Sequence, residues 1–315
     1  MNRQKRNISE SDGWDVMKHY FIINPVAGRP EEKEGLRQEI IRVMTAQEEP
    51  WEIYVTRCAG DAEDYVRRKG RAAQGLVRFY ACGGDGTLNE VVNGAAGLDR
   101  VQVACFPCGS GNDFVRSFDE PGDFQNIRRL VGGRTKVLDL LKINQRFCLN
   151  ICNLGFDAQV AMGMGRFKGI PFVEGSMAYN LSLLRSFLRR IGCELSIELE
   201  GEEIRENFLM VLLANGRFYG GGYEGAPKAA FDDGLLDLVM VKKLSRRKMI
   251  GLIGVYRAGK HLDDPTLKEV IHWRRLTRLR VKSREPVSLC IDGESLQATD
   301  FTAEIVPGIL NFVIP

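Results

Sequence analysis

A run of glycines around one aspartate follows a buried apolar stretch of the chain. Gly83-Gly84-Asp85-Gly86 comes directly after the strand-like segment Leu76–Cys82, and Thr87 opens the amphipathic segment Thr87–Ala96. Glycines let the backbone approach a ligand closely, and the N-terminus of the following helix offers free N–H groups and partial positive charge to a phosphate. The alternative is an ordinary strand-to-helix turn with Thr87 as N-cap, but such a turn leaves Asp85 without an obvious purpose. The pattern favours a phosphate-binding turn.

Further turns of related composition follow other predicted strands. Gly109–Asp113 comes after Val101–Phe106 and is expected to begin another helical stretch, while Asn24 and Thr56 close the first and second strands. The carboxyl ends of parallel strands lie at one edge of a sheet, where ligands bind in doubly wound folds. We therefore expect these strand ends to converge on one crevice. By themselves, Asn24 and Thr56 fit turn-forming or capping roles equally well.

Two acidic turns lie in the second half of the chain. One holds Asp232-Asp233-Gly234 within a glycine-rich stretch, and the other is Asp292-Gly293-Glu294 at the end of a strand-like run. Carboxylates and carbonyls suit Mg²⁺. Asp-Gly is equally the signature of a plain hairpin turn, which the spacing alone favours.

The elements that position these turns change character along the chain. The first half alternates short apolar strands with amphipathic helices, which predicts a parallel sheet wound in β-α-β units. The predicted elements there are His19–Ile23, Gly35–Met44, Trp51–Thr56, Asp61–Lys69, Leu76–Cys82, Thr87–Ala96 and Val101–Phe106. Beyond about Leu140 the pattern is mostly β, with Ser176–Arg190 and Arg246–Lys260 as the clear helices. The predicted strands of this half are Phe147–Ile151, Glu194–Glu200, Asn207–Leu213, Leu235–Val241, Arg278–Val281 and Val287–Ile291.

The composition is that of a soluble globular protein. The 315 residues are 44% apolar and 27% charged with a net charge of +3, close enough to balance that no nucleic-acid partner is expected. Residues 1–17 are interpreted as a flexible tail without a secretory signal, and no apolar run reaches the roughly 18–20 residues of a spanning helix. Eight cysteines without framework spacing fit reduced thiols, so a cytoplasmic location is expected.

The motifs occur in the order of a known family. NPVAG, GGDGTLNEVVNG, PCGSGNDF, NLGFDA, GGGYEGAPKAAFDDGLLD and IDGE resemble, over about residues 18–315, the diacylglycerol kinase catalytic-domain family. The chain is most similar to its bacterial soluble lipid kinases, which also resemble sphingosine kinases. NAD kinases share the Gly-Gly-Asp-Gly turn, whereas Pro107–Phe114 and Pro227–Leu235 point to lipid kinases.

The resemblance implies an α/β fold with the active site in the cleft between two domains. A doubly wound nucleotide-binding domain would span residues 18–142, and a β-sandwich-like domain for the lipid substrate would span residues 143–299. Residues from about 300 to 315 would return to the first domain.

The resemblance also implies ATP and Mg²⁺ as cofactors. The residues that would contact ATP are Asn24, Thr56, Gly83, Gly84, Asp85, Gly86, Thr87, Leu88, Asn89 and Ser110. Asp85 would hold the catalytic Mg²⁺ with the phosphates or act near the acceptor hydroxyl. A structural Mg²⁺ would be held by Asp233 with the carbonyls of Ala230 and Leu235.

The implied reaction transfers the γ-phosphoryl group of ATP to a lipid hydroxyl, first of all that of diacylglycerol to give phosphatidic acid. Such a transfer depends mainly on positioning and charge neutralisation. A carboxylate would accept the hydroxyl proton; Glu294 is favoured over Asp85, although the sequence does not decide between them. Another lipid acceptor such as a sphingoid base, an NAD kinase-like soluble kinase and a catalytically inactive binder remain as alternatives.

A lipid substrate implies peripheral contact with a membrane surface. Two basic clusters could face anionic headgroups: the end of the amphipathic segment Ser176–Ile191, and the cations between Arg274 and Arg284. The alternative is a core-packed helix and a solvated strand face. Strand edges in the β-rich half leave a homodimer open.

Overall fold

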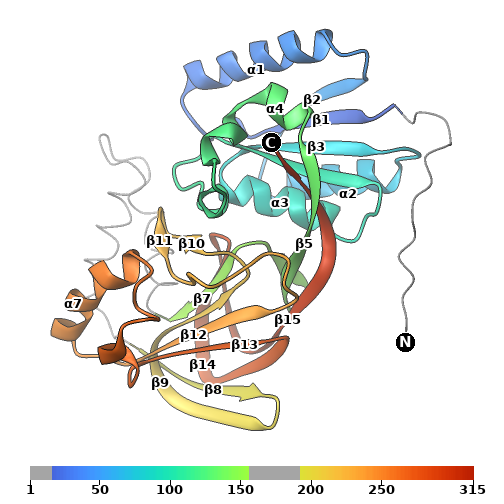
Figure 1. Ribbon diagram of the computed structural model, residues 1–315. Helices are drawn as coiled ribbons and strands as arrows, with labels where there is room; N and C mark the ends of the chain where they lie inside the picture. Colours follow the sequence, from blue (N-terminus) through green and yellow to red (C-terminus); the bar gives the residue numbers. More distant parts are fainter. Residues whose placement is uncertain (1–15, 156–191) are drawn as a thin grey trace.

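The computed structural model describes residues 16–155 and 192–315 (Figure 1). Most of the expected tail, the expected helix Ser176–Arg190 with its basic cluster, and Phe156–Ala158 of the NLGFDA motif lie outside the described residues. None of the described helices is long and apolar enough to cross a membrane.

The N-terminal half is a parallel sheet covered by helices on both faces. Its strands pair in the order β4-β3-β1-β2. The strands are β1 (Lys18–Ile23), β2 (Trp51–Val55), β3 (Val77–Gly83) and β4 (Val101–Pro107). The helices α1 (Pro30–Thr45) and α4 (Ile127–Val131) contact one another on one face, and α2 (Asp61–Arg71) and α3 (Asp85–Ala95) contact one another on the other (Figure 1). All seven residues of β3 are buried, as a strand between two helical layers requires. The doubly wound arrangement predicted from the sequence is confirmed.

The C-terminal half is built mainly from antiparallel strands. β7 (Ile151–Gly155) and β8 (Cys193–Leu199) both pair with β9 (Glu202–Ala214) and with β14 (Arg278–Ile291), and β12 (Leu236–Lys242) pairs with β9 and β13 (Ile271–Leu276). This half also contains the strand β6 (Arg146–Cys148), the short hairpin β10 (Phe218–Tyr219) and β11 (Tyr223–Glu224), the helix α7 (Arg246–Arg257) and the 3-10 turn η3 (Pro265–Leu267). The 3-10 turns η1 (Phe114–Ser117) and η2 (Pro121–Gln125) lie between β4 and α4 in the N-terminal half.

Three expectations about local structure are wrong. The strand predicted at Phe147–Ile151 is divided into β6 and β7, which are separated by Leu149 and Asn150. The two strands predicted at Arg278–Val281 and Val287–Ile291 are one strand, β14, whose pairing register with its neighbour shifts between Lys282 and Val287. The turn at Gly109–Asp113 leads only into the single 3-10 turn η1 instead of a helix.

A long two-stranded ribbon joins the halves. β5 (Arg134–Ile143) pairs antiparallel with β15 (Glu294–Ile314) from Ile143 to Arg134, and Asn311 and Phe312 of β15 also pair in parallel with β4. The main sheet is therefore continuous through both halves and has thirteen strands within the described residues. The sequence pattern predicted no strand at β5, β13 or β15.

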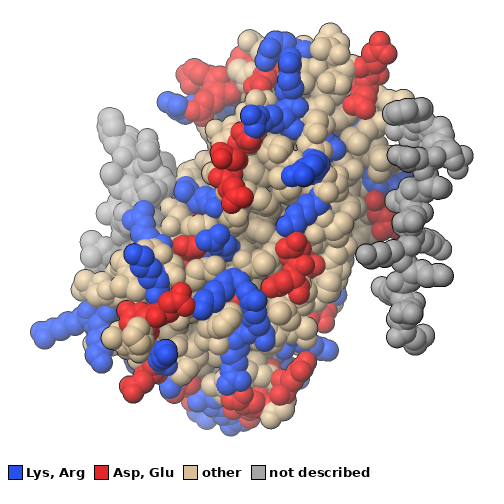
Figure 2. Space-filling view, viewed as in Figure 1, with Lys and Arg blue, Asp and Glu red and all other residues tan. Residues whose placement is uncertain are grey.

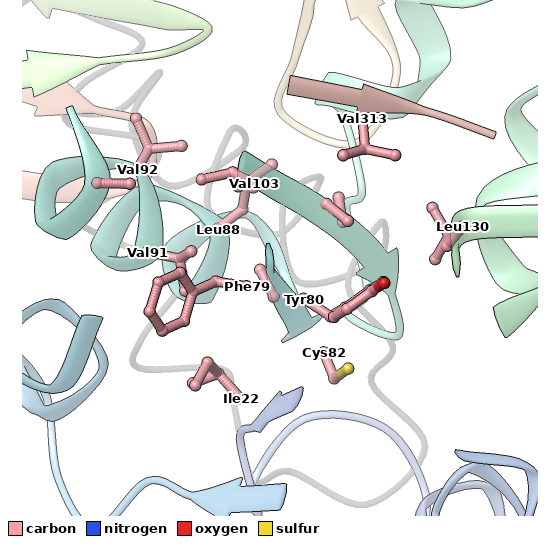
Figure 3. Packing of buried hydrophobic residues seen from close by; sticks show 14 of the residues in the cluster. Ile22, Phe79, Tyr80, Cys82, Leu88, Val91, Val92, Val103, Leu130 and Val313 are labelled. Carbon is pink, nitrogen blue, oxygen red and sulfur yellow. The ribbon is translucent and has the colours of Figure 1, made fainter. Parts of the chain in front are cut away.

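The cores follow this connectivity. Apolar side chains of β1, β3, β4 and α3 form the N-terminal core, and Val313 from the end of the chain packs into it (Figure 3). A second core fills the β-rich half, and a third lies between its outer face and α7. The end of β15 thus belongs physically to the first core, far in sequence from its neighbours.

Candidate active site

The glycine turn after β3 presents an open helix N-terminus. Helix α3 begins at Asp85 after Gly84, whose extended backbone provides no side-chain cap. The alternative of a plain turn with Thr87 as N-cap does not hold: Thr87 lies inside the first turn, is buried, and its Oγ1 accepts a hydrogen bond from Asn24 Nδ2 at 2.9 Å. The first backbone N–H groups of α3 therefore have no side-chain partner at the cap and are oriented to bind an anion.

The two glycine turns touch backbone to backbone. A Cβ placed on Gly109 would lie 2.5 Å from the Cα of Gly84, so a side chain at Gly109 would drive the turns apart. Asn112 bridges the second turn, since its Oδ1 accepts from the N–H of Gly109 and its Nδ2 donates to the carbonyl of the same residue. The predicted convergence of these strand ends is present in the structure.

A buried carboxylate, Asp113, lies beside the half-buried Asp85. Asp85 Oδ1 accepts from the N–H of Asp113 at 2.9 Å, and both side chains face the Cα of Gly111, where a Cβ would lie 2.8 Å from Asp85 Oδ2 and 3.4 Å from Asp113 Oδ2. Asp113 Oδ2 accepts from the N–H of Gly221 in the β10–β11 hairpin. Its Oδ1 is buried without a hydrogen bond, 3.5 Å from Nε of Arg116. Sequence analysis did not single out Asp113, although it stands in the same PCGSGNDF motif as Ser110.

The electrostatics of this pair favour a bound cation. Burial, with the Asp113 charge beside it, raises the pKa of Asp85 to about 7, and burial also raises the pKa of Asp113. Each of two neighbouring, poorly hydrated carboxylates opposes the ionisation of the other. A divalent cation would offset both charges, and Asp113 Oδ1 is free of hydrogen bonds to bind one.

The donor set fits Mg²⁺ shared with phosphate. Among the described residues, no three His, Cys, Asp or Glu side chains cluster so as to hold a metal by themselves. Mg²⁺ is usually bound by one or two carboxylates together with substrate phosphates and water. Asp85 and Asp113 at the mouth of an anion-binding helix end match that pattern.

The other candidates at the strand ends fall into two groups. Asn24, at the end of β1, contacts Thr87, and the N–H of the buried Thr56 donates to the carbonyl of Ile23 at 3.0 Å, which puts Thr56 beside Asn24. Ser110 is exposed at the tip of the second glycine turn. These three residues border the open end of α3.

Leu88 and Asn89 point away from that opening. The Leu88 side chain is 2% exposed in the N-terminal core, and its N–H already donates to the carbonyl of Gly84, so it has nothing to offer a nucleotide. Asn89 is buried at the junction of the halves, where its Nδ2 donates to Asp292 Oδ2 at 2.8 Å. Asn89 therefore connects the domains, and the structure does not support a direct contact of either side chain with ATP.

Asp292 is a half-buried anchor that the sequence indicated only as part of an acidic turn. It occupies the left-handed region at φ 46° in the two-residue turn between β14 and β15. Its two oxygens accept five hydrogen bonds. The donors are Asn89 Nδ2, Cys148 Sγ and the backbone N–H groups of Leu149, Asn150 and Ile151. The carboxylate thereby joins α3, the β6–β7 turn and the hairpin that carries Glu294.

Replacing Asp292 by Asn is expected to destabilise the protein strongly. The change preserves the backbone preference of the turn but replaces an acceptor by an NH₂ group that faces donors. Leaving one or two buried donors unpaired costs about 2–4 kcal/mol in the free energy of unfolding, to be measured by urea denaturation. Asp300→Asn is the matched control, because Asp300 is an exposed carboxylate paired with Arg280 and its loss should change the free energy little. Equal effects of the two changes would contradict the anchor role.

Glu294 lies at the other end of the same turn and meets Arg146. Arg146 Nη2 is 2.9 Å from Glu294 Oε2, while the same guanidinium donates to Glu63 Oε2 at 2.5 Å and to Asn89 Oδ1 at 3.0 Å. Burial raises the pKa of Glu294, and the Arg146 cation opposes that rise. The side chain of Glu294 is 43% exposed, so it can meet a substrate while Arg146 holds its direction.

The Asp233 turn is less well suited to an ion. Asp233 Oδ1 accepts from the N–H of Leu235 at 3.0 Å, and Oδ2 lies 3.7 Å from Arg275 Nη1. Asp139 accepts from the N–H groups of Gly234 and Gly308, which ties this turn to the β5–β15 ribbon. A cation bound here would compete with Arg275 for one oxygen of the Asp233 carboxylate. The ligand set Ala230, Asp233 and Leu235 therefore stays a prediction that this geometry does not favour.

The basic cluster at Arg274–Arg284 is largely neutralised. Cross-strand carboxylates pair with four of its cations: Arg274 with Glu202, Arg275 with Asp233 and Asp237, Arg280 with Asp300, and Lys282 with Glu198. The interpretation as a solvated strand face therefore fits this cluster better than a headgroup-binding surface.

Models of two protein families together match nearly the whole described fold. Residues 18–143 match the diacylglycerol kinase catalytic domain, and residues 150–314 match the YegS C-terminal NAD kinase beta sandwich-like domain. The border between the two matches lies just beyond β5, which pairs with the last strand of the chain.

Individual relatives agree with these matches. The chain is 28% identical to a diacylglycerol kinase of Bacillus subtilis strain 168, covering 87% of this chain and 88% of that protein. It is 30% identical to a YegS-like protein of Stenotrophomonas maltophilia that is named as a lipid kinase, covering 84% and 86%. A solved structure from Bacillus anthracis Sterne, assigned to the diacylglycerol kinases, is similar with a TM-score of 0.75 at 25% identity and covers 96% of this chain and 99% of that one.

Proposed function

The chain belongs to the diacylglycerol kinase catalytic-domain family and is a lipid kinase, and from this premise we propose that it transfers the γ-phosphoryl group of ATP to the hydroxyl of diacylglycerol, forming phosphatidic acid. The single observation that supports this site best is the half-buried Asp85 beside the buried Asp113 at the uncapped N-terminus of α3. Diacylglycerol is named as the acceptor because the Bacillus subtilis relative bears that name.

The residues of the glycine turns would bind the triphosphate. Backbone N–H groups at the start of α3 would donate to phosphate oxygens, with Asn24, Thr56 and Ser110 bordering the nucleotide. Asp85 and Asp113 would hold Mg²⁺ together with the phosphates. When bound, Mg²⁺ neutralises charge that develops on the transferred group. Close backbone approach at Gly84 and Gly109 keeps these groups in fixed positions.

Glu294 would act as the general base. The hydroxyl proton would pass to Glu294 Oε1 or Oε2 as the oxygen attacks the γ-phosphorus. Arg146 would position the carboxylate, and Asp292 would hold the hairpin that carries it. Asp85 is the weaker candidate for the base, because its carboxylate accepts backbone hydrogen bonds and faces Asp113.

The acceptor is tested by ATP turnover on a panel of lipid alcohols in mixed micelles. The panel contains diacylglycerol, monoacylglycerol, a sphingoid base and a polyprenol, with NAD as a soluble control acceptor. We expect Mg²⁺-dependent phosphorylation of diacylglycerol, detected as labelled phosphatidic acid. Turnover on another lipid would correct the acceptor alone, whereas turnover only on NAD would overturn the proposal.

A kinase of this kind would work in the cytoplasm, where ATP and Mg²⁺ are abundant, and would reach its lipid by peripheral contact with a membrane. The free thiols of the described cysteines are compatible with that compartment.

A further inference from the structure

Helix α7 stands in a strongly basic stretch of the chain. Residues 238–262 contain seven Lys and Arg and no Asp or Glu. Within the described residues, Arg247 and Lys248 are exposed and form no ion pair. This distinguishes α7 from the Arg274–Arg284 cluster, whose cations face carboxylates.

The outward face of α7 combines these cations with an exposed apolar patch. We define this face by Arg247, Lys248, Ile250, Gly251 and Gly254. The Ile250 side chain is 64% exposed, and a Cβ on Gly251 or Gly254 would meet no atom within 4 Å. Residues at helical spacing of three and four share one side of a helix, so Arg247 lies beside Ile250 and Gly251. Gly254 continues this side one turn further on, and Lys248 borders the face next to Gly251.

Folding alone does not account for that face. The opposite side of α7 already supplies the packing, because Met249, Leu252 and Tyr256 are buried in the core beneath the helix. Cations in the first turn oppose the helix dipole, which favours acidic residues there, and the first turn of α7 has no acidic residue. The unfavourable interaction of these cations with the helix dipole and the exposure of Ile250 indicate a binding partner. Such a partner would have an anionic surface above an apolar interior.

The position of α7 links this face to the site. The Arg257 guanidinium lies over the Tyr223 ring of the β10–β11 hairpin at 5.4 Å, and Gly221 in the same hairpin donates to Asp113. Figure 1 shows α7 and β11 on the same flank, and Figure 2, viewed from the same side, shows Lys and Arg side chains projecting from that margin. A surface that docks here lies one hairpin away from the catalytic carboxylates.

We propose that the outward face of α7 docks on an anionic lipid bilayer, with Arg247 and Lys248 at the phosphate headgroups and Ile250 inserted at the acyl boundary. This inference rests on the proposed lipid acceptor. Basic helices with an apolar centre adsorb to anionic membranes in this way, and the binding weakens with salt.

The test is sedimentation of the full chain with vesicles of phosphatidylcholine containing about 30% phosphatidylglycerol, an anionic content that gives the surface a negative potential. We expect binding at low salt that is lost at high salt and on pure phosphatidylcholine. The double variant Arg247→Glu/Lys248→Glu should bind at least about tenfold more weakly. Its matched control is Arg37→Glu/Arg42→Glu, which makes the same charge change on exposed positions of α1 and should retain most of the binding.

A second measurement follows Ile250 itself. Tryptophan fluorescence of Ile250→Trp should shift to the blue on these vesicles and be quenched by brominated lipid, while Ile250→Ser should weaken binding several-fold. Absence of the shift, or equal losses in the α7 and α1 double variants, would overturn the docking face.

Turnover separates this inference from the proposed function. The α7 double variant should phosphorylate a monomeric short-chain diacylglycerol at the wild-type rate and lose activity only on vesicles. If the wild type binds vesicles through α7 but phosphorylates no lipid, the docking face stands and the diacylglycerol proposal fails. If short-chain diacylglycerol is phosphorylated and charge reversal on α7 leaves vesicle binding unchanged, the docking face fails alone.

Discussion

Replacing Asp85 by Asn is expected to abolish phosphoryl transfer and, in the absence of Mg²⁺ at pH 8, to stabilise the protein. The neutral amide keeps an oxygen to accept the N–H of Asp113, but it removes one of two carboxylates that lie side by side. Loss of a metal ligand at the phosphates should lower turnover by about a thousandfold. Loss of activity together with a more stable fold is expected when a carboxylate must be charged to bind the metal ion but its charge destabilises the fold.

The sign of the stability effect follows from the pKa. In the folded protein the pKa of Asp85 is raised to about 7, whereas an unfolded Asp titrates near 4. Between these values the folded state binds more protons, so the free energy of unfolding falls as the pH rises through this window. The neutral amide of the variant does not titrate and so removes that loss, which a difference of about three pKa units limits to at most about 4 kcal/mol at pH 8.

Thermal unfolding across pH 5–8, with and without Mg²⁺, measures how the stability of the protein depends on pH and on the bound cation. Wild-type Tm should fall toward pH 8 and recover with Mg²⁺, and the variant should be less sensitive to both. Asp99→Asn, at an exposed position, is the control and should change neither Tm nor turnover. A variant that loses stability at pH 8, or that responds to Mg²⁺ like the wild type, would refute the cation site.

Replacing Glu294 by Gln is expected to lower turnover by roughly a hundred- to a thousandfold, the range of a lost general base. The apparent affinity for ATP should stay nearly unchanged, because Glu294 lies across the junction from the glycine turns. Glu304→Gln is the matched control: Glu304 lies on the same strand, its side chain is 39% exposed against 43% for Glu294, and it also faces a cation, Lys142. Unchanged turnover in Glu294→Gln would exclude the base role and favour Asp85.

The pH profile provides an independent readout of the same carboxylate. A base accepts a proton only when ionised, so the wild-type rate should fall on the acidic side through a pKa above the ordinary value of 4.5 for Glu. Arg146→Met removes the opposing cation and should move this acidic limb to higher pH, whereas Arg146→Lys should restore its position at least in part. An acidic limb that does not move would show that Arg146 does not act on the base.

Local pattern was sufficient for the first half of the fold. The apolar strands and amphipathic helices up to Val101–Phe106 lie within a few residues of the observed elements, except that α1 begins earlier, at Pro30. Gly83–Gly86 was recognisable because close backbone approach and an open helix end require glycine. The hydrogen bond that Thr87 Oγ1 accepts from Asn24 was not recognisable in this way, because Asn24 follows another strand.

Long-range pairing was not visible in local pattern. β5 and β15 alternate only weakly between buried and exposed positions at their ends, and each becomes a strand because it finds the other across the chain. For the cations of Arg274–Arg284 the sequence left a headgroup-binding surface and a solvated strand face open, and the paired carboxylates favour the solvated face. Neither the pairing of β5 with β15 nor the carboxylates opposite these cations can be recognised from residues that are neighbours in the sequence.

The sequence by itself determined the family, the parallel nucleotide-type half and the residues at the strand ends, because these depend on short spacings that only glycine and aspartate satisfy. The tertiary structure alone decided that Asp113 lies beside Asp85, that Asn89 and Asp292 join the halves, and that Arg146 forms an ion pair with Glu294. Those assignments arise from contacts between residues 28 to 203 positions apart, and burial and charge act through distance in space. The two carboxylates of the turn Asp292-Gly293-Glu294 thus have different roles. Asp292 anchors the hairpin through five hydrogen bonds, and Glu294 is the proposed base.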